Sequence, residues 1–574
     1  MDRTAWIVVS LCVIGLIAWY IYIGKQMPHP RPSTISASPS VPPPVTTPSP
    51  SPSPYFPPSP IPTPTPVQSA PTFPEKIETL RNADVELRLT NRGGGIKEAV
   101  LLNQIAEQGE RVVLNSAGSA PIGAIIEQPA SPVLPEFTIS GSSNSAVQFE
   151  HTTPEQIMIR KKFFFQPSLG KKDNFVSQME VDFENRGSQP FQSPGYFVAL
   201  GSAAPIHPRD YSYYTRLVWC IDGRAKGVDV GWFGASGGVL GLGQRTARPF
   251  YQEDIAGAEW VAVSDQFFTT LVAPLTAKAN AVWGRRFDIE RAPDQKLPAI
   301  EGALGLPSFR LQPGQTYSAG FEIYAGPKLY HRLAQLPHNE AEVVDFGIFK
   351  IVCQFLLNFM NLLHSWLHDY GLAILALTTI IKLTLWPIQN RANRSMRRMA
   401  ALSPKMQELR EKYKDDPTRM NQEVMKLYKQ YGINPVGGCL PMMIQIPIFF
   451  GLFKMLGQAV ELRNAKFLWV KDLSQPDTVA HLPVLGWPIN IIPLCMAATQ
   501  IWLMAMTPKT GDPTQRRVMM FTPLIFLFIC YNFAAALALY YTAQNLFSIL
   551  QFYQNKRQPM PKLEKVAPPG KRKR

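Results

Sequence analysis

Cysteine is scarce in this chain and is poorly arranged for cross-linking or metal binding. Six cysteines occur among 574 residues, and only Cys220 lies in the segment 75–328, whose pattern indicates a separate domain. A lone thiol cannot form a disulfide within that domain, so an apolar core must hold it together. The absence of a CxxC pair or a Cys/His cluster predicts no metal site. The chain also lacks a GxxxxGK[ST] loop, so we predict no nucleotide or other cofactor and no catalytic site.

Acidic residues are outnumbered by basic ones. The chain has 42 Asp and Glu against 57 Lys and Arg, for a net charge of +15. The basic excess is concentrated in residues 389–434 and in the last twenty residues. Basic runs beside apolar segments typically mark the cytoplasmic side of a membrane. They also attract anionic lipid or RNA, so the charge alone does not identify a partner.

The first 74 residues contain an apolar run followed by a proline-rich one. Residues 5–23 carry no charge and would measure about 28 Å as a helix, enough to cross a bilayer core. A cleaved signal peptide is the alternative, but no small-x-small site follows the run, so we expect 1–27 to be an uncleaved anchor. Residues 28–74 hold 19 prolines, which favours an extended linker.

Residues 75–328 show a different pattern, typical of a β-sandwich. Apolar and polar residues alternate in short runs at 84–90, 158–165 and 175–183. Gly, Asn and Ser separate these runs, as in the stretch NRGGG at 91–95. Period-two alternation with frequent turn residues predicts antiparallel strands packed in two layers. We therefore assign 75–328 to an all-β domain.

The next region, 329–369, is predicted to contain an amphipathic helix in the membrane interface. Polar residues recur every three or four positions within 346–369 and form one stripe on an apolar helix. They are Lys350, Gln354, Asn358, Asn361, Ser365 and His368.

Five further apolar segments predict membrane spans in residues 370–555. Three of them are 370–388, 436–460 and 484–506. The run 518–552 would be about 50 Å long as one helix, too long for a single crossing. A break at Tyr531-Asn532 divides it into 518–530 and 534–552. With the N-terminal anchor, six spans place both termini on one side of the membrane.

Positive charge indicates which side that is. Residues 389–434 carry eleven Lys and Arg against five Asp and Glu, and the tail 556–574 ends in Lys571, Arg572, Lys573 and Arg574. With six spans these basic segments share one face, which the positive-inside rule makes cytoplasmic. The all-β domain is then extracytoplasmic, and the protein is a multi-pass membrane protein.

The basic segment 389–434 is predicted to fold as a cytoplasmic helical hairpin. Ser403-Pro404 and Asp416-Pro417 are both typical helix starts, with a capping side chain followed by proline. The hairpin is rich in methionine, a flexible apolar side chain that suits varied partners. Packing of the hairpin against itself is the alternative interpretation. The methionines are Met396, Met399, Met406, Met420 and Met425.

Lys382 is the most informative residue for function. It lies inside an apolar segment, where a cation costs about 2.5–3.5 kcal/mol on insertion scales. The five predicted spans after residue 370 contain no Asp or Glu, so an internal ion pair is not expected. Lys382 either faces a water-filled groove or extends its long side chain toward the basic loop. Other polar groups at membrane depth could line a groove with it, among them Thr378, Gln445, Thr499, Gln500, Tyr541, Gln544 and Asn545.

Several stretches around Lys382 match a known family. IIKLTLWP at 380–387 leads into the basic, methionine-rich loop, and NPVGGCLP at 434–441 leads into QIPIF at 445–449. LYY at 539–541 and Asn545 lie in the last predicted span. The chain resembles the YidC-type membrane protein insertases, closely over 346–555. WVAVSDQFFTTLVAP at 260–274 resembles the periplasmic domain of the Gram-negative members. The resemblance therefore implies a protein of the cell inner membrane whose all-β domain, 75–328, is periplasmic.

The resemblance implies a function and the residues that perform it. A positively charged groove would accept hydrophilic parts of nascent membrane proteins, and the protein would act as insertase and chaperone, alone or with the Sec translocon. Lys382 matches a position that is usually arginine, which keeps the charge but loses bidentate hydrogen bonding. Thr378, Phe449, Met496 and Tyr541 match substrate-contacting positions. The basic tail would contact the ribosome or anionic lipids.

Two other functions fit parts of the pattern. A secondary transporter could use Lys382 as an anion site, and an envelope scaffold could bind partners through the all-β domain. A transporter predicts an internal repeat, and none is visible between 370–460 and 484–552. A scaffold requires 75–328 for function, whereas an insertase predicts that this segment can largely be deleted. GASGG at 234–238 matches GxSxG but lacks a following helix, which favours a turn.

Overall fold

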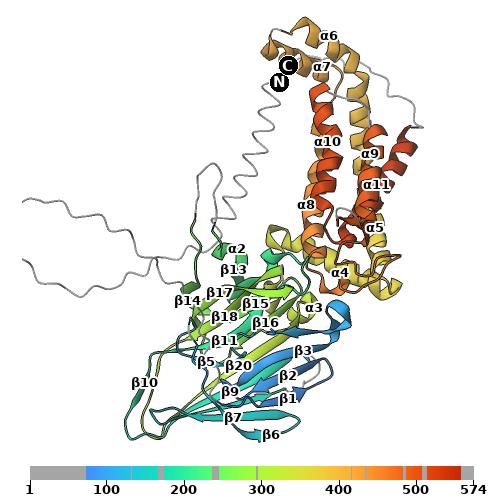
Figure 1. The fold of residues 1–574 in the computed structure, drawn as a ribbon. Coiled ribbons are helices and arrows are strands. Elements are labelled where there is room, and N and C mark those ends of the chain that lie inside the picture. Colours follow the sequence, from blue (N-terminus) through green and yellow to red (C-terminus); the bar gives the residue numbers. More distant parts are fainter. Residues whose placement is uncertain are drawn as a thin grey trace, which may run out of the picture.

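The computed structural model describes residues 73–556 except 131, 166–173, 236–244, 293–294, 415, 434–435, 483–485 and 507–512. The expected anchor 5–23, nearly all of the proline-rich linker and the basic tail therefore lie outside the described residues. Two bodies make up the described part: a β-domain and a bundle of long helices (Figure 1). The helices rise from one end of the β-domain.

The β-domain is built from antiparallel sheets, as the alternation predicts. Its largest sheet has nine strands among the described residues, in the order β13, β12, β15, β16, β20, β9, β8, β7, β6. Their bounds are Arg224–Asp229, Arg216–Ile221, Trp260–Ser264, Phe268–Pro274, Thr316–Pro327, Val176–Asn185, Ile157–Phe164, Ala146–Thr152 and Thr138–Ser142.

Two smaller sheets complete the sandwich. One has the order β14, β17, β18, β11, β5, with bounds Tyr251–Ala258, Ala279–Ala292, Gln295–Leu306, Tyr196–Ala203 and Ile125–Ile126. The other has the order β1, β2, β3, β4, with bounds Ile77–Arg81, Val85–Thr90, Gly95–Ile105 and Arg111–Leu114. A short pair joins β10 (Phe191–Ser193) to β19 (Phe309–Leu311).

The apolar positions of the alternating runs form the core of this domain. Along β8 every second residue is buried, from Ile157 to Phe163. Trp219, Trp260 and Phe268 are fully buried between the sheets. The prediction of an all-β sandwich at 75–328 is confirmed, and it accounts for β1 through β20.

Helix α4 (Lys350–Leu367) follows the β-domain and runs across the end of the bundle that lies next to the β-domain (Figure 1). One face packs inward through Cys353, Leu356, Met360 and their neighbours. The opposite face exposes apolar side chains, with Ile351 82% and Trp366 73% exposed. The predicted helix at 346–369 is therefore present, but its exposed surface is more apolar than the polar stripe suggested.

The bundle consists of α5 (Tyr370–Ala401), α8 (Val436–Leu456), α9 (Ile491–Met506), α10 (Pro513–Cys530) and α11 (Ala535–Lys556). Asp369 caps α5 by accepting a hydrogen bond from the Leu372 backbone N–H at 2.8 Å. The predicted break at Tyr531-Asn532 is confirmed, because α10 ends at Cys530 and α11 begins at Ala535.

Two helices differ in extent from the predicted spans that they contain. The helix that contains the predicted span 370–388 is longer than the span, because α5 continues as one helix to Ala401. The last thirteen residues of α5 therefore belong to the segment that we assigned to the hairpin. The segment 484–506 is helical only from Ile491, since the short strand β22 (Pro488–Asn490) pairs with β21 (Thr478–His481) just before it.

The hairpin helices α6 (Ser403–Lys412) and α7 (Pro417–Gln430) lie at the end of the bundle far from the β-domain (Figure 1). Asp416 caps α7 as predicted. Ser403 does not cap α6, because it is already the first helical residue and Leu402 holds the cap position. The pair has its own small core, in which Tyr428 donates a hydrogen bond to the Met406 sulfur, whereas Met425 is 48% exposed.

Two described helical segments are long and apolar enough to cross a membrane: Gly347–Leu367 and Tyr370–Ala401. Shorter apolar helical segments run over Gln445–Leu456, Ile491–Met506 and Phe521–Cys530.

Candidate functional site

Lys382 lies on α5 at its contact with α11. Its side chain is partly buried, and its Nζ donates a hydrogen bond of 2.9 Å to the Ser548 hydroxyl. Ser548 in turn donates to the backbone carbonyl of Gln544 at 2.9 Å. Among the described residues, Ser548 is the one protein group that accepts a hydrogen bond from this amino group. Lys382 therefore has a neutral partner in place of a counter-ion.

Ser548 belongs to a polar stripe along α11. The stripe recurs at intervals of three and four residues, so its members share one helix face over about 22 Å. They are Tyr540, Gln544, Ser548, Gln551 and Asn555. Most of these side chains are buried against neighbouring helices. A polar stripe that faces the interior of a helix bundle is the arrangement expected for a hydrophilic groove.

At one end of the stripe, α8 contributes Gln445. Its Nε2 donates to the Tyr540 hydroxyl and to Gln544 Oε1, both at 3.2 Å. Thr378 is buried on α5 and donates to the carbonyl of Ile374 within its own helix. Thr378 is thus one turn from Lys382, but its hydroxyl is occupied by the backbone.

At the other end, α5 and α11 are joined by amide side chains. Asn390 Oδ1 accepts from Gln551 Nε2 at 2.8 Å and from Asn555 Nδ2 at 3.1 Å. Arg397 Nη1 donates to the Asn555 carbonyl at 2.6 Å. These bonds hold the two helices together beyond Lys382, on the side of the α6 and α7 pair.

An aromatic cluster flanks the stripe on α8 and α10. The ring of Phe449 meets that of Tyr541 edge-on, with centroids 5.3 Å apart, and lies 5.9 Å from Phe526. Tyr541 is buried and also lies 5.7 Å from Phe526. The cluster gives this side of the site an apolar wall.

Helix α9 contributes Met496 and Thr499. The Met496 backbone carbonyl accepts from Asn545 Nδ2 at 3.2 Å, and the same amide donates to the Thr499 hydroxyl at 3.2 Å. Gln500 is partly buried on α9. None of the hydrogen bonds between described residues joins Gln500 to Lys382 or Gln445.

The structure thus brings Lys382 and Gln445 against α11, which itself carries Tyr541, and Phe449 and Met496 also contact this helix. Sequence reasoning missed Ser548 and the bonds of Asn390 with Gln551 and Asn555. The spacing of the α11 stripe could have revealed Ser548 and Gln551 together with Gln544. The basic tail residues Lys571, Arg572, Lys573 and Arg574 lie outside the described residues.

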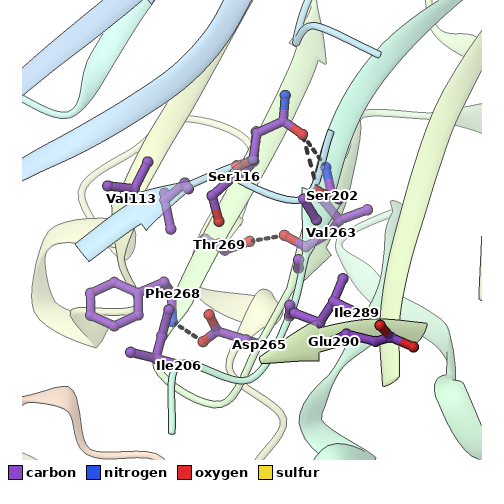
Figure 2. Close-up of a pocket in the computed structure, with 16 residues that line it drawn as sticks. Val113, Ser116, Ser202, Ile206, Val263, Asp265, Phe268, Thr269, Ile289 and Glu290 are labelled. Atoms are coloured by element: carbon purple, nitrogen blue, oxygen red, sulfur yellow. Dashed lines mark hydrogen bonds between the residues drawn. The ribbon is translucent and has the colours of Figure 1, made fainter. Parts of the chain in front are cut away.

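The β-domain holds a separate cavity of about 330 Å³ (Figure 2). Its polar lining is already bonded within the domain: Asn115 Oδ1 accepts from the backbone and the hydroxyl of Ser202. Asp265 accepts from the Phe267 and Phe268 backbone N–H groups at 2.7 Å. Burial raises the pKa of the Asp265 carboxyl, despite these bonds and nearby Lys328. Asn115 and Asp265 therefore form hydrogen bonds with other residues of the domain.

Two family models match consecutive parts of the chain. The model described as YidC periplasmic domain matches residues 78–359, and that described as 60Kd inner membrane protein matches residues 362–562. The chain belongs to the YidC family. The boundary between the two matches falls within α4, between the β-domain and the bundle.

Relatives in the YidC family carry the name membrane protein insertase YidC. The protein from Syntrophobacter fumaroxidans is 38% identical over 298 residues, which cover 51% of this chain and 53% of that protein. The protein from Syntrophus aciditrophicus is 43% identical over 260 residues, which cover 45% of this chain and 46% of that protein. The chain thus spans about half the length of the curated relatives that it matches. The name describes insertion, which is not an enzymatic reaction.

Among solved structures, the chain is similar to that titled active YidC insertase crystal structure with the first transmembrane domain resolved. The sequence identity is 18% and the TM-score is 0.34, and the match covers 84% of this chain and 95% of that chain.

Proposed function

We propose that this chain is an insertase and chaperone that inserts and folds membrane proteins in the inner membrane. Lys382 and the polar stripe on α11 would accept the hydrophilic end of a nascent membrane protein. The proposal rests mainly on the bonding of Lys382, whose one described acceptor is the neutral Ser548 hydroxyl. A cation with a weak partner inside a helix bundle is available to an anionic group of a substrate.

The free energy for this step comes from the substrate itself. Moving a polar segment through lipid is costly because its backbone and charges lose water. A polar groove shortens the distance over which the polar segment must cross lipid, and Lys382 would attract its acidic residues. Burial of the substrate's apolar span then releases about 25 cal/mol per Å² and drives its exit into lipid. No cofactor is needed in this mechanism.

The proposed topology has six spans with both termini cytoplasmic. The β-domain would be periplasmic, α4 would lie in the membrane interface, and the α6 and α7 pair would be cytoplasmic. Figure 1 supports this arrangement, because the α6 and α7 pair and the β-domain lie at opposite ends of the bundle. The basic residues of 389–434 and of the tail would then bind the ribosome or anionic lipids. The protein would insert substrates alone or together with the Sec translocon.

The test is insertion by the purified protein in liposomes. A small single-span substrate with an acidic N-terminal tail is synthesised in vitro and scored by protease protection. Wild type and Lys382→Arg should protect the substrate, whereas Lys382→Ala should be about tenfold slower, since loss of about 1.4 kcal/mol of attraction is tenfold in rate. Lys296→Ala, which removes an exposed charge on β18, is the matched control and should behave as wild type.

The remaining outcomes separate the alternatives. Equal protection by wild type and Lys382→Ala would keep the insertase function and show that the substrate path does not use Lys382. No protection above empty liposomes, with folded protein, would contradict the proposed function and favour a transporter or an envelope scaffold.

A further inference from the structure

The loop between α8 and β21, residues 457–477, lies between the β-domain and the bundle. We call it the α8–β21 loop. It contains one short 3₁₀ turn, Val460–Leu462, and otherwise irregular backbone. Irregular backbone keeps a fixed shape only if its polar groups find partners. Those partners come from two sides.

On the bundle side, the α8–β21 loop caps two helices. The carbonyls of Leu473 and Gln475 accept from the backbone N–H groups of Ala536 and Ala535 at 3.0 and 2.9 Å. Asp477 Oδ2 accepts from the backbone N–H of Ile492 at 2.8 Å. These N–H groups are in the first turns of α11 and α9, where no intrahelical partner is available. The loop therefore fixes where both helices begin.

On the β-domain side, the same loop is held by side chains. Gln475 Nε2 donates to Asp210 Oδ1 at 2.8 Å, and Gln266 Nε2 donates to the Gly457 carbonyl at 2.7 Å. Asp210 and Gln266 are both buried. Gln475 is thus bonded to the β-domain through its side chain and to α11 through its carbonyl.

Arg463 makes a second attachment. Its Nη2 donates to the Ile105 carbonyl of β3 at 2.9 Å, and its guanidinium lies 5.0 and 5.2 Å from the ring centres of Phe267 and Phe268. Arg463 is 6% exposed. Figure 2 shows Phe268 in the wall of the β-domain cavity, so the ring that meets Arg463 belongs to the domain core. Its Nε and Nη1 are buried without a hydrogen-bond partner among the described residues, so the Ile105 carbonyl and the two rings are the contacts that hold it.

We propose that the β-domain positions the groove helices by holding the α8–β21 loop. Asp210, Gln475 and Arg463 are the positioning residues. They fix the first turns of α9 and α11, and hence the placement of Met496, Tyr541 and Gln544 further along these helices. This inference rests on the proposed function, because it assigns the β-domain a role in shaping the same groove. It also narrows the expectation that 75–328 can largely be deleted, because the parts that carry Asp210 and the Ile105 carbonyl would have to be kept.

Amide hydrogen exchange of the full chain in lipid nanodiscs tests the positioning without any substrate. Gln475→Ala and Arg463→Met should each speed exchange about tenfold at Ala535, Ala536 and Ile492, the change expected when a hydrogen bond to a charged group is lost. Asp254→Asn, at an exposed position on β14, is the control and should leave these amides unchanged. If Arg463→Met does not fold, Asn464→Ala replaces it, since Asn464 donates to the same Ile105 carbonyl at 3.2 Å.

Unchanged exchange in folded variants would overturn the positioning. Liposome insertion then tests its consequence: the variants should insert substrate several-fold more slowly than wild type and Asp254→Asn. Faster exchange with insertion within twofold of wild type would overturn the link to the groove and leave the insertase function intact. Failure of wild type to insert would contradict the proposed function, whereas the exchange measurements would still decide the positioning.

Discussion

The β-domain and the helical bundle each contain a lysine whose side chain is buried or partly buried, and the two lysines differ in their hydrogen-bond partners. Lys161 on β8 is 1% exposed, and its Nζ donates to the carbonyls of Gly93, Gly94 and Gly123 at 2.8, 3.0 and 3.0 Å. The ring of Phe137 lies 4.7 Å from the same nitrogen. Lys382 has one described acceptor, the Ser548 hydroxyl.

The glycines explain how three carbonyls can converge on Lys161. Gly94 has φ +55° and Gly123 has φ +81°, conformations that other residues rarely adopt. An added Cβ at Gly94 would lie 2.8 Å from the Phe137 ring, and one at Gly123 would lie 2.8 Å from the Met179 sulfur. The ammonium of Lys161 has three N–H donors and three carbonyl acceptors, so we assign it a structural role. Lys382 has one acceptor among the described residues, so under the proposed function its other N–H donors would be available to a substrate.

The largest expected effect comes from removing the Lys161 amino group. Lys161→Met should lower the free energy of unfolding of the β-domain by about 3 kcal/mol, because three buried carbonyls lose their donor at about 1 kcal/mol each. Urea unfolding of the full chain in detergent, followed by tryptophan fluorescence, measures this. Lys162→Met is the matched control on the other face of β8, where the ion pair with Glu180 is exposed, and should change little. Equal effects of the two substitutions would contradict a structural role for Lys161.

The same lysine predicts a pH dependence. Burial lowers the pKa of Lys161 to about 7 in the folded protein, whereas an unfolded lysine has a pKa of about 10.4. Between these values the unfolded chain binds a proton that the folded one does not. The stability of wild type relative to Lys161→Met should therefore rise from pH 7 toward pH 10, by up to about 1.4 kcal/mol per pH unit. A flat difference across this range would show that the buried amino group keeps its charge.

A smaller effect is expected when Lys382 loses its partner. Ser548→Ala should lower the free energy of unfolding by about 2 kcal/mol, because it loses two hydrogen bonds, one from Lys382 and one to the Gln544 carbonyl, at about 1 kcal/mol each. Insertion should stay within about twofold of wild type, since the charge remains in place. A tenfold loss of insertion would show that Ser548 orients Lys382 for the substrate. Lys382, like Lys161, would then depend on its protein acceptor for its position.

Much of the fold follows from periodicity. The alternating runs predicted β2, β8 and β9, and the same alternation puts Lys161 on the buried face of β8 together with Ile159 and Phe163. Its acceptors could not be predicted, because Gly93 lies 68 residues earlier in the chain and meets β8 only through the tertiary fold. NRGGG could be interpreted as a turn but not as a lysine site.

The extent of α5 could not be predicted from the sequence, for a physical reason. Proline commonly ends a helix because it lacks an N–H and crowds the preceding turn, yet α5 passes through Pro387 and continues to Ala401. Packing of Asn390 and Arg397 against α11 supports the helix beyond that point. Composition identified Lys382 as a candidate residue, but its partner Ser548 lies 166 residues away, so the contact depends on helix packing.

The continuity of α5 has a mechanical consequence. From Lys382 to Ala401 the helix extends about 29 Å without interruption, and α6 begins at Ser403 directly afterwards. Pro387 lies within α5, and the helix continues through it. Under the proposed function, no loop therefore separates Lys382 from the α6 and α7 pair, so a partner bound to that pair would act on Lys382 through a single helix.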